Sequence, residues 1–151
     1  MKRTFSILIF LSGLLLFTHC KKETEDWIFC NCEIDSWVGE YTGDGNYYKD
    51  EEVDAETVSV QVNIEQFSPK NLTISVIATD VYSQTFYGIK EDSTYYLTIN
   101  GSNKSLIMNL KKKGYDLKLI GTAKNFHWET NDDSTFLVTD KTLAFDVLQQ
   151  P

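Results

Sequence analysis

One histidine could act as a general base in this chain. Catalysis by a serine, a histidine and an aspartate needs the histidine to take the serine proton. Beyond Cys20 the chain has a single histidine, His127, within the segment 125–129, and no G-x-S-x-G turn accompanies it. We place His127 in a loop before the last strand and expect a surface or packing residue.

Acidic side chains are plentiful, but their spacing does not favour glycoside hydrolysis, which needs two carboxyl groups that face each other across the substrate. Many of them lie in one run, residues 50–56, with the sequence DEEVDAE. A run of like charges is typical of a solvated loop. We therefore predict that the protein is not an enzyme and that it holds no cofactor.

Two cysteines, Cys30 and Cys32, form a C-x-C pair. A direct disulfide between residues so close in sequence is difficult to build without strain, because the bond needs specific Cα separations and dihedral angles. The alternatives are a strained redox bond, a bridge to another chain, half of a metal site, or two inert thiols. Zinc needs four nitrogen or sulfur ligands, and one histidine is too few. We expect no metal here.

The N-terminus has the composition of a secretory signal. Lys2 and Arg3 precede an uncharged apolar run at residues 5–17, which is shorter than the roughly 20 residues of a membrane-spanning helix. The run ends in Phe17-Thr-His-Cys20, which resembles the lipobox that lipoprotein signal peptidase recognises. This resemblance implies that Cys20 becomes the lipid attachment site.

The lipoprotein resemblance also implies a division of the chain. Residues 1–19 would be the signal peptide, 20–35 a lipidated tether and 36–151 the folded domain. The acidic residues just behind Cys20 resemble the export signals of Bacteroidota lipoproteins. We expect a protein of the cell envelope, attached to the outer membrane by its acyl chains and facing the periplasm or the cell surface.

The charge of the chain argues against nucleic acid as a partner. The net charge is −8, and removal of Lys2 and Arg3 with the signal makes it −10. Nucleic-acid binding needs a basic surface that releases counterions from phosphates. The cationic cluster of the expected domain is Lys111-Lys112-Lys113, which we place at a hairpin tip.

From Ser36 onward, apolar and polar residues alternate with a period of two, which predicts β-strands with one buried face. Residues 57–65 show the pattern most clearly. The residues expected to point inward are Trp37, Val58, Val60, Val62, Ile64, Leu72, Ile74, Val76, Leu97, Ile99, Leu106, Met108, Leu110, Leu117 and Leu119. The expected strands lie near 36–48, 56–66, 71–79, 82–90, 94–100, 105–111, 115–123 and 135–148, the last of them broken or continuous at Asp140.

Short connections with turn residues separate these strands, so neighbours in sequence should pair antiparallel. A meander of about eight strands exposes two edges unless it closes on itself. We therefore predict an all-β fold, a single antiparallel up-and-down β-barrel. A two-sheet β-sandwich is the alternative.

The segment Trp37-Val-Gly39-Glu-Tyr41-Thr-Gly43 places an aromatic residue and glycines on one face of the first strand. This segment resembles the opening strand of calycin-type barrels, the lipocalin, fatty-acid-binding and avidin group. The resemblance implies a calycin-like lipoprotein of the Bacteroidota whose barrel binds a small ligand.

Aromatic residues on the expected strands could line such a site, because each ring supplies contact area and each tyrosine hydroxyl a directional hydrogen bond. The candidate ligand-binding residues are Trp37, Tyr41, Tyr82, Phe86, Tyr95 and Tyr115. A small apolar or ring-bearing ligand would suit them. The alternative is an interaction protein with a packed core, such as an inhibitor, an accessory subunit or a surface antigen, because side chains alone can fill an eight-stranded barrel.

Overall fold

The computed structural model describes residues 26–50, 52–91 and 94–151. Within them, the regular structure is β-sheet apart from one short 3₁₀ helix, η1 (Ile34–Ser36). The strands are β1 (Ile28–Phe29), β2 (Gly39–Lys49), β3 (Glu56–Gln66), β4 (Asn71–Ala78), β5 (Tyr82–Ile89), β6 (Tyr96–Asn100), β7 (Lys104–Lys113), β8 (Asp116–Thr130) and β9 (Thr135–Gln149). All pair antiparallel, which confirms the all-β prediction.

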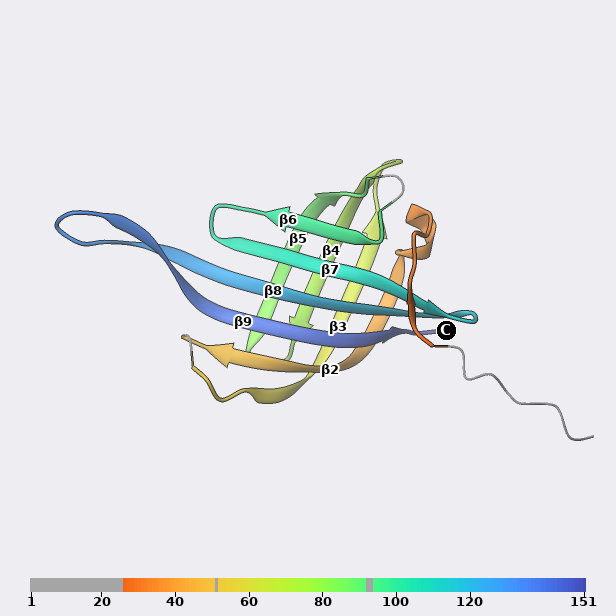
Figure 1. Cartoon of the computed structure of the whole chain (residues 1–151), viewed down its shortest axis with the longest axis horizontal. Helices are drawn as coiled ribbons and strands as arrows, with labels where there is room; N and C mark the ends of the chain where they lie inside the picture. Colours follow the sequence, from red (N-terminus) through yellow and green to blue (C-terminus); the bar gives the residue numbers. More distant parts are fainter. Residues whose placement is uncertain (1–25, 51, 92–93) are drawn as a thin grey trace, which may run out of the picture.

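The strands form one sheet in the order β1-β7-β8-β9-β2-β3-β4-β5, and β6 also pairs with β7. The sheet curls so that β3, β4 and β5 cross steeply behind β7, β8 and β9 (Figure 1). Neighbours in sequence pair from β2 to β5 and from β6 to β9, and two long-range pairings are added to these: β9 pairs with β2, and β1 pairs with β7. The last strand thus joins two sequential meanders.

The interior of the curl is filled by the alternate apolar residues of the strands, as the period of two predicts. Twelve of the fifteen expected inward residues are buried, while Val58, Ile99 and Leu117 are partly buried against the same core. The core also includes Phe145 and Val147 of β9, which the pattern did not single out.

The two ends of the curled sheet, β5 and β6, lie together without a strand ladder. In the described part of the chain no backbone hydrogen bond joins them. The Lys104 ammonium donates a hydrogen bond to the Thr85 carbonyl (2.7 Å) across the gap, and Ile99 covers the bare backbone of Gly88. The expected closure into a hydrogen-bonded barrel is not confirmed.

One end of the interior is closed by η1 and Trp37, whose side chain is fully buried. The Tyr41 hydroxyl lies 3.1 Å from the carbonyl oxygens of Ser36 and Trp37 and donates to this pair. The Lys90 ammonium lies 5.5 Å from the centre of the Trp37 ring. The aromatic residue expected at the start of the domain therefore acts as part of the core.

One expectation about the strands is wrong in detail, and one that the sequence left open is settled. The strand expected at 115–123 continues to Thr130, so the loop expected to hold His127 is strand. The last strand is continuous, but its pairing with β8 shifts between Asn125 and Phe126, which leaves Asp140 as an extra residue in a β-bulge. In addition, Ile28 and Phe29, inside the expected tether, pair with β7.

Candidate functional site: a projecting hairpin

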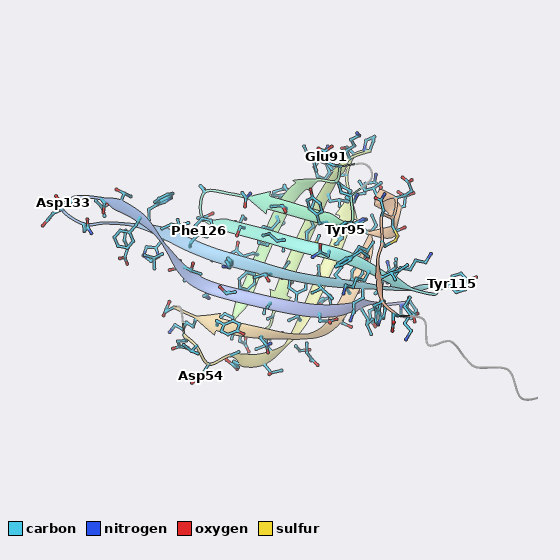
Figure 2. All side chains as sticks on the ribbon, in the orientation of Figure 1. Asp54, Glu91, Tyr95, Tyr115, Phe126 and Asp133 are labelled. Carbon is cyan, nitrogen blue, oxygen red and sulfur yellow. A yellow bond between two sulfur atoms is a disulfide. The ribbon has the colours of Figure 1, made fainter. Side chains whose placement is uncertain are left out.

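The six residues predicted to bind a ligand do not come together. Trp37, Tyr41, Tyr82 and Phe86 are buried in the core, while Tyr95 and Tyr115 are exposed on the outside. Figure 2 shows Tyr115 at the tip of the turn between β7 and β8, well away from Tyr95. A single pocket lined by all six is therefore not formed.

The buried tyrosine hydroxyls are already hydrogen-bonded within the protein. The Tyr82 hydroxyl donates to the Asn125 side-chain oxygen (2.9 Å), as the Tyr41 hydroxyl does to backbone carbonyls. Burial raises the pKa of both phenols above the ordinary value, so both stay neutral. Neither hydroxyl is left over to orient a ligand inside the core.

The feature that sequence reasoning missed is the outer part of the β8–β9 pair. Pairing of β7 with β8 ends at Asn125, and pairing of β2 with β9 ends at Lys141. Beyond those points, residues 126–130 and 135–139 pair only with each other among the described residues. This segment, the projecting hairpin (residues 126–139), extends away from the curled sheet (Figure 1).

The tip of the projecting hairpin is held by local hydrogen bonds. The Asn131 side-chain oxygen accepts from the backbone N–H groups of Asp133 (3.2 Å) and Ser134 (2.9 Å). The Asn131 N–H also donates to the Ser134 carbonyl (3.0 Å). An asparagine that hydrogen-bonds the backbone just after it is a frequent turn former, so the tip is built from its own sequence.

Large apolar side chains stand on both faces of the projecting hairpin. Trp128 is opposite Leu137 on one face, and Phe136 is opposite Glu129 on the other. The exposed fractions are 61% for Trp128, 45% for Leu137 and 42% for Phe136. A single exposed apolar residue is ordinary, whereas here three stand on one element that the core does not cover.

A charged cluster lies at the base of the projecting hairpin. The Nδ1 atom of His127 is 2.5 Å from Oδ1 of Asp140, and its Nε2 atom is 3.1 Å from Oε1 of Glu129. The hydrogen bond to Asp140, and after it the one to Glu129, raises the pKa of His127 above 6.5. The bulge matters here, because it turns the extra residue Asp140 toward the imidazole.

This cluster is an ion pair network when the imidazole is protonated. Both nitrogens of the imidazole are engaged by carboxylates, and in the described part of the chain no serine, threonine or cysteine hydrogen-bonds to the ring. The described residues also contain no group of three histidine, cysteine, aspartate or glutamate side chains that could hold a metal ion. The cluster can cross-link the hairpin and carry a charge that depends on pH.

The C-x-C pair forms a disulfide between Cys30 and Cys32, one of the alternatives that the sequence left open. The N–H group of Cys30 donates to the Leu110 carbonyl (2.9 Å), and both cysteines pack against the core. The disulfide therefore stands where the N-terminal segment joins the sheet. Cys20 and the expected signal peptide lie outside the described residues.

None of the described residues belongs to a helix long and apolar enough to cross a membrane. No family model, no curated protein and no solved structure matches the chain.

Proposed function

We propose that this protein is a lipid-anchored, non-enzymatic interaction protein of the bacterial cell envelope that holds a partner protein with the projecting hairpin. The observation that carries the proposal is the exposed pair Trp128 and Leu137 on a two-stranded element outside the core. An isolated hairpin is marginally stable in water. A partner that covers its apolar faces would stabilise it.

The filled interior favours this role over storage of a small ligand. Trp37, Tyr41 and Phe86 are among the largest fully buried side chains, and they belong to one continuous core. A ligand inside the curl would have to displace them. Binding of a small apolar or ring-bearing ligand stays a prediction that requires such a rearrangement.

For the fold, we propose a calycin-like barrel in which side chains, rather than a ladder, close the junction of β5 and β6. Support comes from the single core, from the nearly sequential meander, and from the Lys104 ammonium that bridges to Thr85. The relation to calycin-like lipoproteins of the Bacteroidota stays a proposal that rests on the sequence resemblance.

The position of the N-terminus fits an anchored protein. Asp26, the first described residue, lies beside Lys113 and Gly114, next to Tyr115, which Figure 2 shows at the opposite end of the molecule from Asp133 at the hairpin tip. Five residues lie between Cys20 and Asp26, so the two Cα atoms are roughly 20 Å apart at most. An acylated Cys20 would therefore hold one end near the bilayer and present the projecting hairpin away from it.

The proposal is tested with two surface variants. Trp128→Ser combined with Leu137→Ser removes the apolar pair of the hairpin, while Tyr87→Ser combined with Ile89→Ser removes an equally exposed pair on β5. Each protein is purified from its own host, and bound subunits are measured by native mass spectrometry. We expect added protein mass on the parent and on the β5 variant, but not on the hairpin variant.

Added mass that survives in the hairpin variant would refute the hairpin as the docking site, and a retained small molecule would support the ligand alternative instead. Lipid attachment is tested separately by feeding radiolabelled fatty acid to expressing bacteria. We expect label on the parent and none on Cys20→Ser. Equal labelling of both proteins would contradict the proposed anchor.

A further inference from the structure

The end of the molecule where the chain enters the fold has a surface unlike the rest. The end of β7 and the turn after it expose Lys112 and Tyr115 and leave Lys113 half-buried, and β1 beside them exposes Ile28 and Phe29. These five residues are called the basic rim below. Their side chains combine positive charge with apolar and aromatic surface, although the chain as a whole is acidic.

The register of the sheet brings the basic rim together. Ile28 pairs with Lys112 and Phe29 with Lys111, so β1 lies along the lysine-rich end of β7. Lys111 stacks its ammonium over the Phe29 ring at 4.8 Å, and Lys118 does the same over Trp27 at 4.9 Å. The first residues of the fold and the lysines thus form one continuous surface.

Two of the lysines are available to an outside partner. Lys118 is engaged by Asp146 (3.0 Å), whereas neither Lys112 nor Lys113 has a hydrogen bond or an ion pair with any described residue. Both line a hollow of about 440 Å³ together with Asp26, Ile28 and Gly114. With Lys111 and Lys118 included, four lysines stand near three acidic side chains, Asp26, Asp116 and Asp146, so the local excess of positive charge is one.

The opposite end of the molecule carries the reverse charge. Figure 2 shows Asp54 and Asp133 on loops far from Tyr115. Those loops contain the acidic run 50–56 and the tip sequence Asn131-Asp-Asp-Ser134. A negatively charged surface would therefore attract the end with the basic rim and repel the end with the projecting hairpin.

We propose that the basic rim is a membrane-seating surface, which rests on the headgroups of an anionic bilayer beside the acylated Cys20. Lysines near such a surface are attracted to it, and exposed aromatic rings settle at the depth of the headgroups. This inference rests on the proposed anchor for its orientation. The tether keeps the basic rim close to the bilayer, so a weak intrinsic affinity is enough to hold it there.

Vesicle sedimentation tests the seating surface without the acyl chains. The protein runs from residue 20 to residue 151 with Cys20→Ser, and the vesicles are phosphatidylcholine with or without phosphatidylglycerol. We expect binding to the anionic vesicles that falls as salt is added. The combined change Lys112→Gln and Lys113→Gln should weaken the partition about 25-fold, because each lysine contributes roughly fivefold near an anionic surface.

The matched control changes the same number of charges elsewhere. Lys49→Gln with Lys124→Gln alters two exposed lysines away from the basic rim, and it should bind as the parent does. Circular dichroism of each variant verifies that the sheet is formed. No binding by the parent to anionic vesicles, or an equal loss in both double variants, would overturn the proposal.

A second measurement reports the seated position directly. In Tyr115→Trp the new indole stands at the tip of the basic rim, and brominated lipid should quench its fluorescence more strongly than that of the parent. Equal quenching would overturn the seating geometry. The hairpin variant Trp128→Ser/Leu137→Ser should bind vesicles normally, so a failure of the proposed partner site would be distinguishable from a failure of this one.

Discussion

The two halves of the β8–β9 pair differ in burial, although they belong to the same two strands. The inner half is residues 118–125 with 141–148, and the outer half is residues 126–130 with 135–139. In the inner half Leu119 of β8 faces Val147 of β9, and both are fully buried between flanking strands. In the outer half Trp128 faces Leu137, and both are exposed. Strand β8 alternates apolar and polar residues in both halves, as Leu117 and Leu119 do at the inner end and Phe126 and Trp128 in the outer half. Alternation therefore predicts which residues share a face, but not whether anything covers that face.

Loss of a core side chain from the inner half should have the largest effect on the stability of the protein. Phe145→Ala removes a buried ring whose neighbours include Gly121, and we expect it to lower the free energy of unfolding by about 3–5 kcal/mol. Trp128→Ala in the outer half should change it by about 0.5 kcal/mol or less. Urea unfolding of both variants measures the difference, and similar values would abolish the distinction between the two halves.

A side chain added to the inner half should lower the free energy of unfolding less than the removal of a buried ring does. A Cβ atom at Gly121 would lie 2.5 Å from Cζ of Phe145 and 2.8 Å from the Ile107 carbonyl oxygen. We expect Gly121→Val to destabilise the protein by about 1–3 kcal/mol through overpacking. Thermal unfolding measures this, with Gly101→Ala in an exposed turn as the control. A melting temperature equal to that of the parent would show that the sheet relaxes around the new methyl groups.

Changes at the tip should loosen only the outer half. Asn131→Ala removes the side-chain oxygen that accepts from two backbone N–H groups, a loss of about 0.5–1 kcal/mol. Hydrogen exchange should accelerate at residues 126–139 and stay unchanged in β2 and β3. Faster exchange throughout the sheet would mean that the projecting hairpin is coupled to the core.

The smallest effect should be the response of the outer half to pH. The two carboxylates raise the pKa of His127 above 6.5 in the folded protein. The stability that the charged imidazole gives the projecting hairpin is therefore complete below about pH 6.5 and is lost as the pH rises through the pKa of the folded state. NMR titration measures the pKa. Asp140→Asn should lower it more than Glu129→Gln does, because the bond to Asp140 is the larger cause. The opposite order would place the main contact at Glu129.

Much of the fold was predictable from the period of two. The inward positions of β3, β4 and β7 follow from the alternation of Val, Ile and Leu with polar residues, because a strand presents successive side chains to opposite faces. The junction of β5 and β6 was not predictable. Whether two edges join by a ladder depends on how Ile99 packs over Gly88, a contact between residues that no local pattern relates.

The candidate site was only partly predictable. The turn at Asn131 is visible in the sequence, with Phe126 and Trp128 before it and the apolar run 136–138 after it. Apolar residues on both sides of one turn were the signal for the projecting hairpin. The charged residues His127 and Glu129 beside Trp128 favoured a loop. A strand is predicted from the contrast between an apolar and a polar face, and this contrast is weak where both faces are exposed.

The place of β9 in the middle of the sheet bears on how the protein is made. Strands β2 to β5 can pair with one another as soon as they are available, and so can β6 to β8, but a strand ladder links the two groups only through β9. The joining pairs link residues near positions 41–49 with residues 141–149, a separation that makes closure slow relative to local hairpins. Completion of β9 is thus the event that joins the two half-sheets into one hydrogen-bonded sheet, and until then each half-sheet has an unpaired edge strand.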